Sequence, residues 1–176
     1  FATDVNDPIF SDTTAHIMGQ EQFSWFTDVL RNSSSRWKVV GNQLMLSQLR
    51  AVDPNIPLIF ENWDGYPYER NKIFDVLENN NINDVVFTTG DFHVSIATDV
   101  AREPFDSTDY VEATGSGSLL TEFVVPSVSG ANYDEGVGID LGPLNGLPAE
   151  QIEGLLAAAN PHIKHAEMTS AGYILL

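Results

Sequence analysis

"NDVVFTTGDFHVSIATDV", residues 83–100, leads from an apolar run to a carboxylate and an imidazole. Residues 84–89 are rich in β-branched and aromatic side chains, and this composition predicts a buried strand. Gly90 ends the run, and Asp91 and His93 follow it. Because ligands of α/β sheets bind beyond the carboxyl ends of strands, the segment predicts a functional site at the end of this strand.

Helical and extended patterns alternate along the rest of the chain. Apolar residues at helical spacing predict helices over residues 20–31, 67–79 and 148–160. Apolar β-branched runs predict a short buried strand over residues 37–40 and another strand over residues 119–126. Turn residues predict a long loop over 130–147, and alternation around Ser170–Gly172 predicts a β-hairpin over 162–176. Helices that alternate with strands, together with an antiparallel hairpin, indicate an α/β sandwich.

Size and charge narrow the class of protein. With 176 residues and a hydrophobic fraction of 43%, the chain is long and apolar enough for one folded domain. It carries 25 acidic and 8 basic residues, and a net charge of −17 argues against nucleic acid or anionic membranes as partners. No apolar run approaches the roughly 18 residues that a membrane span needs. The absence of cysteine excludes disulfides and thiolate ligands within this sequence.

Asp91 and His93 are candidate metal ligands. If the backbone stays extended here, the two side chains point the same way, roughly 6 to 7 Å apart. A carboxylate and an imidazole are natural ligands of Zn²⁺, Mn²⁺ or Fe. Taken alone, the pair also fits a purely structural role, in which the aspartate caps a turn and the histidine is a packing residue.

Two other segments offer polar groups. Asn42 follows the strand at 37–40, and its amide can ligate a metal or donate to a phosphoryl oxygen, although Gly-Asn also favours a plain turn. "NWDGYPYER", residues 62–70, is either a substrate loop or a hydrophobic turn before a helix. The remaining histidines lack a partner at useful spacing and are predicted to be surface or packing residues: His16, His162 and His165.

Four segments, in this order, resemble the PhoD-like alkaline phosphatases, metal-dependent phosphoesterases of the calcineurin-like superfamily. They are "HIMGQEQFSWFTDVLRNSSSRWKVVGNQLMLSQL", "NWDGYPYERNKIFDVL", "VVFTTGDFHVSIATDVA" and "TEFVVPSVSG". The resemblance covers roughly residues 16–130, and "NPHIKHAEMTSAGYILL" is similar to the closing hairpin of the family.

The resemblance implies a four-layer αββα fold with a metal cluster at the strand ends. It implies hydrolysis of phosphate monoesters or diesters, an alkaline phosphatase or phosphodiesterase activity, by a metal-activated water. Iron and calcium are the expected ions, with zinc, manganese or magnesium as alternatives, and members are commonly secreted, periplasmic or on the cell surface. Asp91 and His93 match the last metal-site motif, Gly-Asp-x-His, and are the expected catalytic metal ligands. The expected substrate-binding residues are Asn42, Trp63, Asp64 and Tyr66.

The sequence departs from the family in one important respect. The earlier Gly-Asp and Asp-Asp-His-Glu blocks are absent, and "GD" occurs only at Gly90-Asp91. We therefore expect residues 1–176 to be the carboxy-terminal portion of one metallophosphatase domain, with the amino-terminal half as its partner. This portion alone is expected to be inactive. The competing hypothesis is a non-enzymatic acidic module that binds cations or a protein partner.

Overall fold

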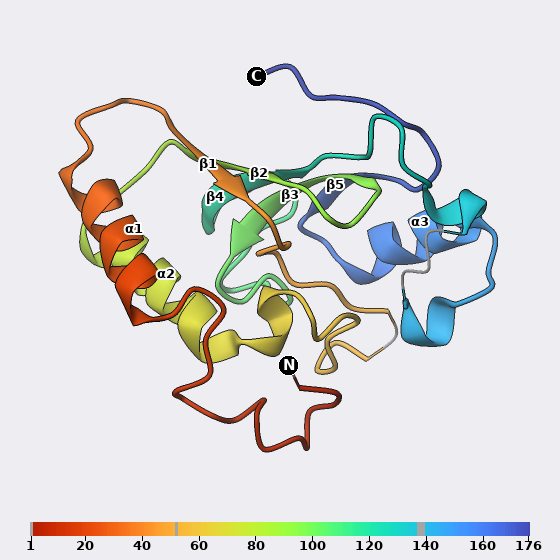
Figure 1. The fold of residues 1–176 in the computed structure, drawn as a ribbon, viewed down its shortest axis with the longest axis horizontal. Helices are drawn as coiled ribbons and strands as arrows, with labels where there is room; N and C mark the ends of the chain where they lie inside the picture. The colour runs from red at the N-terminus through yellow and green to blue at the C-terminus, as the bar shows by residue number, and fades with distance from the viewer. Residues whose placement is uncertain (1, 52, 137–139) are drawn as a thin grey trace.

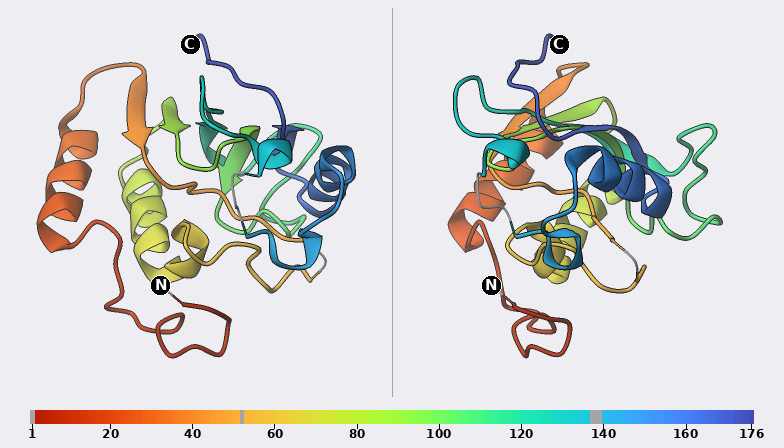
Figure 2. Two further views of the ribbon diagram at one scale, coloured as in Figure 1. Left: turned by 45° about the vertical axis from the view of Figure 1, so that its right-hand side comes forward. Right: turned by 90° about the vertical axis from the view of Figure 1, so that its right-hand side faces the viewer.

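The computed structural model describes residues 2–51, 53–136 and 140–176. They form a mixed α/β fold with one five-stranded sheet, and the three α-helices lie on the same side of it (Figures 1 and 2). The helices are α1 (Gln20–Asn32), α2 (Pro67–Asn79) and α3 (Ala149–Ala159). The strands are β1 (Lys38–Asn42), β2 (Val85–Thr89), β3 (Ser95–Ala101), β4 (Ser118–Val124) and β5 (Ile163–Glu167). Three short 3₁₀ helices complete the described elements: η1 (Trp63–Gly65), η2 (Tyr133–Glu135) and η3 (Gly142–Leu144).

The sheet has the strand order β1-β2-β4-β3-β5. Strands β1, β2 and β4 are parallel, whereas β3 runs antiparallel to both β4 and β5. In the parallel part, Asn42 pairs with Thr89, and Thr89 pairs with Val124. The carboxyl ends of three strands therefore meet at one edge, directly before Gly90 and Asp91.

One face of the sheet is packed into the core. Phe87 of β2 belongs to a buried cluster with Phe26 of α1 and with Ile73 and Phe74 of α2. Burying a side chain such as Phe87 stabilises the fold by about 1.5–3 kcal/mol. A second cluster joins α3 to β3 and to the end of β4, and it contains Ile96, Val124, Ile152 and Leu156.

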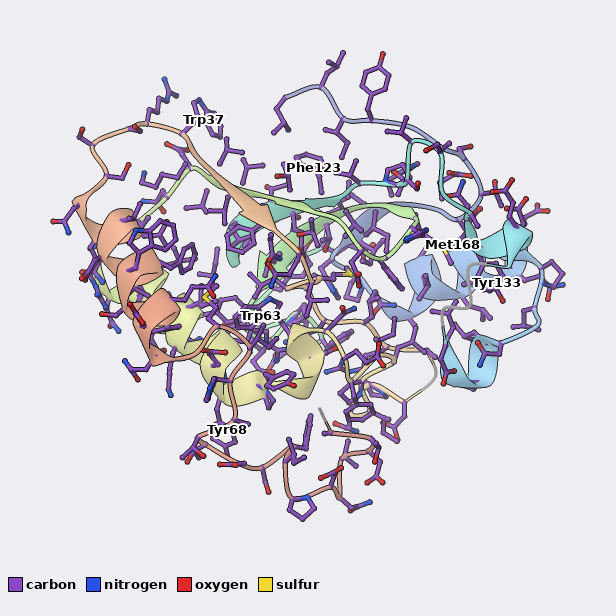
Figure 3. All side chains as sticks on the ribbon, viewed as in Figure 1. Trp37, Trp63, Tyr68, Phe123, Tyr133 and Met168 are labelled. Atoms are coloured by element: carbon purple, nitrogen blue, oxygen red, sulfur yellow. The ribbon has the colours of Figure 1, made fainter. Side chains whose placement is uncertain are left out.

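The opposite face of the sheet is covered by no helix among the described residues. Trp37 and Phe123 lie on this side in Figure 3, away from α1 and α2. Trp37 is 59% exposed and Val39 is 58% exposed, because β1 is an edge strand whose side chains alternate between the two faces. We name the exposed and partly exposed apolar residues here the open face: Trp37, Val39, Val86 and Phe123.

The predicted helices and two of the predicted strands are confirmed. Helix α2 has the predicted bounds, and Pro67 occupies its first turn, where no backbone N–H is needed. The predicted strand at residues 37–40 is present as β1, but the prediction that it is buried is wrong. Among the described residues β1 pairs with β2 alone, and every second side chain of it is exposed. Strand β3 was not predicted.

The predicted C-terminal hairpin is also wrong. Strand β5 pairs with β3, with His165 opposite Ala97, and residues 170–176 form no strand. The predicted loop at 130–147 contains η2 and η3, and residues 137–139 of it lie outside the described part of the chain. The mixed α/β class is confirmed, whereas the second sheet of a four-layer sandwich stays a prediction. None of the helices described is both long and apolar enough to cross a membrane.

Candidate functional site

The turn after β2 presents Asp91 and His93 from a constrained backbone. Both residues have a positive φ, 68° for Asp91 and 57° for His93, so the expected extended geometry is wrong. Aspartate and histidine enter this left-handed region more readily than most residues, but a non-glycine residue there still costs about 1–2 kcal/mol. Buried Phe92 and Val94 hold the turn in place. Such local strain is typical of functional sites.

The ring of His93 is oriented by a backbone hydrogen bond. Its Nδ1 lies 2.6 Å from the carbonyl oxygen of Ala131, and a carbonyl accepts only, so Nδ1–H is the donor. In the neutral ring, Nε2 then carries the lone pair. A histidine that ligates a metal is usually oriented in this way through its second nitrogen.

A short segment after β4 forms the wall opposite this turn. Asp91 and His93 line a hollow of about 330 Å³ together with Pro126 and Ser127. Gly130 packs so closely that a Cβ there would lie 2.7 Å from Ser127 Oγ and 3.4 Å from His93 Cε1. A larger residue at this position would therefore displace the Ser127 hydroxyl, whereas the distance to His93 is close to an ordinary contact.

Asp91 and His93 fit a metal ion but do not complete its coordination. The carboxylate of Asp91 is exposed, and no described residue donates a hydrogen bond to it. Within residues 2–51, 53–136 and 140–176, no three carboxylate or imidazole groups gather at one point. A catalytic zinc site, for comparison, uses about three protein ligands.

Asn42 lies at the same edge of the sheet, beside the residue that precedes Asp91. Its backbone oxygen accepts a hydrogen bond from Gly90 N at 3.2 Å. Its side-chain Nδ2 donates to the carbonyl of Leu44 and, at 3.1 Å, to Thr89 Oγ1. Both amide hydrogens are thus used inside the protein, and the acceptor oxygen Oδ1 is left.

Trp63 and Asn42 share a groove between α1 and β1. The groove has a volume of about 380 Å³, and its walls include Trp25, Trp37 and Gln43. Trp63 itself is buried under the sheet, as Figure 3 shows. Tyr66 lies half-buried between η1 and α2 and does not line this groove.

The carboxylate of Asp64 is buried in the protein and is not available at this edge of the sheet. It is 3% exposed, and its two oxygens lie 2.6 Å from Arg50 Nη1 and 2.7 Å from Arg70 Nη1. The backbone N–H of Leu49 donates to it as well, at 2.9 Å. These contacts tie Arg50 and η1 to α2, which is a role in the fold.

Sequence reasoning missed the carboxyl group of Glu122, which is completely buried in β4. Its oxygens accept hydrogen bonds from Leu46 N, Ser47 N and Thr89 Oγ1 at 2.6 to 3.1 Å. Burial raises the pKa of the Glu122 carboxyl above its usual value, although these donors act in the opposite direction. A charged residue inside the apolar run "LLTEFVVP" was the available indication.

His162 is a packing residue, as predicted. Its Nε2–H donates to the carbonyl of Gln48 at 2.8 Å, and its ring meets the edges of Phe105 and Tyr110. Burial lowers the pKa of His162 to about 4, so the ring is neutral near pH 7.

Fold and site together define a mixed α/β protein with candidate metal ligands at the carboxyl ends of its parallel strands. The sequence profile of the PhoD-like phosphatases matches residues 2–176, and the chain belongs to this family.

A known protein and a solved structure are similar to the chain. Over 118 residues, 66% of its length, it is 31% identical to alkaline phosphatase D of Bacillus subtilis (strain 168), of which it covers 19%. A solved structure of PhoD matches 93% of the chain with a TM-score of 0.72 and 24% identity, which supports the fold. The chain covers 28% of that structure, so it spans less than a third of either relative.

Proposed function

We propose that this chain takes part in phosphate-ester hydrolysis and that Asp91 and His93 are ligands of the metal centre. Membership of the PhoD-like phosphatase family supports the reaction class. The observation that carries the assignment is the left-handed turn after β2, which presents an exposed carboxylate beside an imidazole oriented by Ala131. The substrates are phosphate monoesters or diesters.

The two side chains would bind the metal through different atoms. Asp91 would use its carboxylate, and His93 would use Nε2, because Nδ1–H is held by the Ala131 carbonyl. Iron and calcium are the proposed ions, with zinc, manganese or magnesium as alternatives. A bound cation pair would lower the pKa of a coordinated water and would attract the phosphoryl oxygens. It would also reverse the local field of a chain with a net charge of −17.

The remaining ligands are proposed to come from the amino-terminal half of the same domain. The open face supports this proposal, because Trp37 and Val39 leave apolar surface that a second sheet would bury. A sheet packed there would also reach the edge at which β1, β2 and β4 end. In this proposal the protein is exported and acts in the periplasm, at the cell surface or outside the cell.

The function is tested on the full-length protein with p-nitrophenyl phosphate and bis(p-nitrophenyl) phosphate. We expect hydrolysis of at least one ester, loss of turnover after chelation, and recovery after metal is returned. A full-length protein that holds metal and hydrolyses neither ester would favour the cation-binding module instead.

A further inference from the structure

The carboxyl ends of β1, β2 and β4 are joined by a buried chain of hydrogen bonds. Asn42 Nδ2 donates to Thr89 Oγ1 at 3.1 Å, and Thr89 Oγ1 donates to Glu122 Oε1 at 2.6 Å. Thr89 and Glu122 are both completely buried, whereas Asn42 is only half-buried. The chain therefore runs from the core to the exposed edge that carries Asp91.

The other oxygen of Glu122 fixes the segment that follows Asn42. Ser47 N donates to Glu122 Oε2 at 2.8 Å, and Leu46 N donates to both oxygens at 2.9 and 3.1 Å. One carboxyl group thus holds both the Thr89 hydroxyl and the backbone after β1. Each of these bonds offsets part of the cost of burying the carboxyl group.

We propose that Glu122 and Thr89 are positioning residues, which orient Asn42 so that its amide oxygen faces the ester-hydrolysing site. The proposal rests on the proposed function. Because Leu44 and Thr89 take both amide hydrogens, Asn42 offers its ligand an acceptor. Its partner is accordingly a cation or a donor group such as a coordinated water, and not a bare phosphoryl oxygen.

The test is a double-mutant cycle in the full-length protein. Thr89→Val removes the hydroxyl and keeps the shape, and we expect kcat/KM to fall about 10-fold or more, as for lost orienting groups in metal sites. Asn42→Ala is expected to lose at least as much. Thr89→Val added to Asn42→Ala should change nothing further, because the hydroxyl acts through Asn42. Additive losses would overturn the proposal.

Thr98 supplies the matched control. It is a second buried threonine, opposite Glu122 in the register, and its hydroxyl contacts Ser47 Oγ and the carbonyl of His162 instead of Asn42. Thr98→Val should lower the melting temperature about as much as Thr89→Val and leave kcat/KM unchanged. An equal loss of kcat/KM in both variants would mark the effect as structural and overturn the proposal.

A spectroscopic measurement separates this proposal from the proposed function. In the unaltered protein the two Nδ2 protons of Asn42 should give distinct, slowly exchanging NMR signals, and Thr89→Val should remove this protection. Unchanged signals would overturn the positioning role, whatever the activity. If the unaltered protein hydrolyses no ester, the proposed function fails, and these signals still decide the orientation of Asn42. Glu122→Gln, where it folds, should loosen the Leu46 and Ser47 amides in hydrogen exchange.

Discussion

The sequence predicts both Asp64 and Asp91 as residues of the site, but their carboxylates lie in opposite environments in the structure. Asp64 is buried, and two arginines and a backbone N–H satisfy its carboxylate. Asp91 is exposed on a left-handed turn, and no described residue donates to it. A carboxylate with saturated contacts stabilises the fold, whereas one that is held rigidly and left free can bind a ligand.

The largest effect on stability is expected from Asp64→Asn. This change leaves Arg50 and Arg70 buried without their counter-charge, so we expect a loss of about 3–5 kcal/mol in the free energy of unfolding. Urea denaturation of the full-length protein measures it. With metal removed from both proteins, Asp91→Asn, at an exposed position, should change the same quantity by less than about 0.5 kcal/mol. Equal stability losses in the two variants would contradict the claim that Asp64 stabilises the fold and Asp91 does not.

The neutral, buried His162 predicts a second large effect, which depends on pH. Its pKa is about 4 in the folded protein and 6.5 in the unfolded chain, so between these values only the unfolded chain binds the proton. Stability should therefore fall by about 3 kcal/mol as the pH drops from 6.5 to 4. Unfolding of the unaltered protein and of His162→Gln across this range measures it, and the variant should lack this component. If the difference in stability between the unaltered protein and His162→Gln does not vary with pH, the prediction is wrong.

Backbone strain at Asp91 predicts a smaller effect. Because glycine adopts a positive φ without penalty, Asp91→Gly should be about 1 kcal/mol more stable than Asp91→Ala. Thermal melts of the two variants compare them directly, and neither variant retains the carboxylate. A more stable alanine variant would show that the turn is not left-handed in solution.

The smallest effect is expected at two ion pairs near the surface, whose carboxylates are exposed whereas that of Asp64 is buried. Arg102 contacts Asp75 and Glu78 at the surface of α2. Arg102→Gln should cost less than about 1 kcal/mol, and high salt should reduce the difference further. A loss as large as that of Asp64→Asn would mean that burial does not govern these pairs.

Local patterns sufficed to predict the helices, β2, β4 and the position of Asp91 and His93 at a strand end. Pairing between distant segments was not predictable from such patterns. Strand β5 pairs with β3. In β3 the buried side chains alternate at Ile96, Thr98 and Val100, but the polar residues of "SIATDVA" make this alternation hard to recognise in the sequence. The local pattern of the tail therefore predicts a hairpin.

The site could be predicted only where its residues are close in sequence. The Gly-Asp-x-His motif is contiguous, and it marked Asp91 and His93 correctly as neighbours at the strand end. The contacts that separate Asp64 from the site join it to Arg50 and Arg70 through the folded loop. The bonds from Glu122 to Leu46 and Ser47 span 76 and 75 residues, so no local pattern contains them.

The central claim is that Asp91 and His93 hold the metal of a phosphoesterase. Metal content and turnover of the purified full-length protein, compared with those of Asp91→Asn, test it most directly. Because the loss of an orienting group alone costs about 10–100-fold, loss of a ligand should lower turnover by more than about 100-fold. We expect this fall together with lost metal, and we expect the two proteins to melt at the same temperature once metal has been removed from both, because bound metal itself stabilises the folded state. Full metal content and near-normal turnover in Asp91→Asn would contradict the assignment.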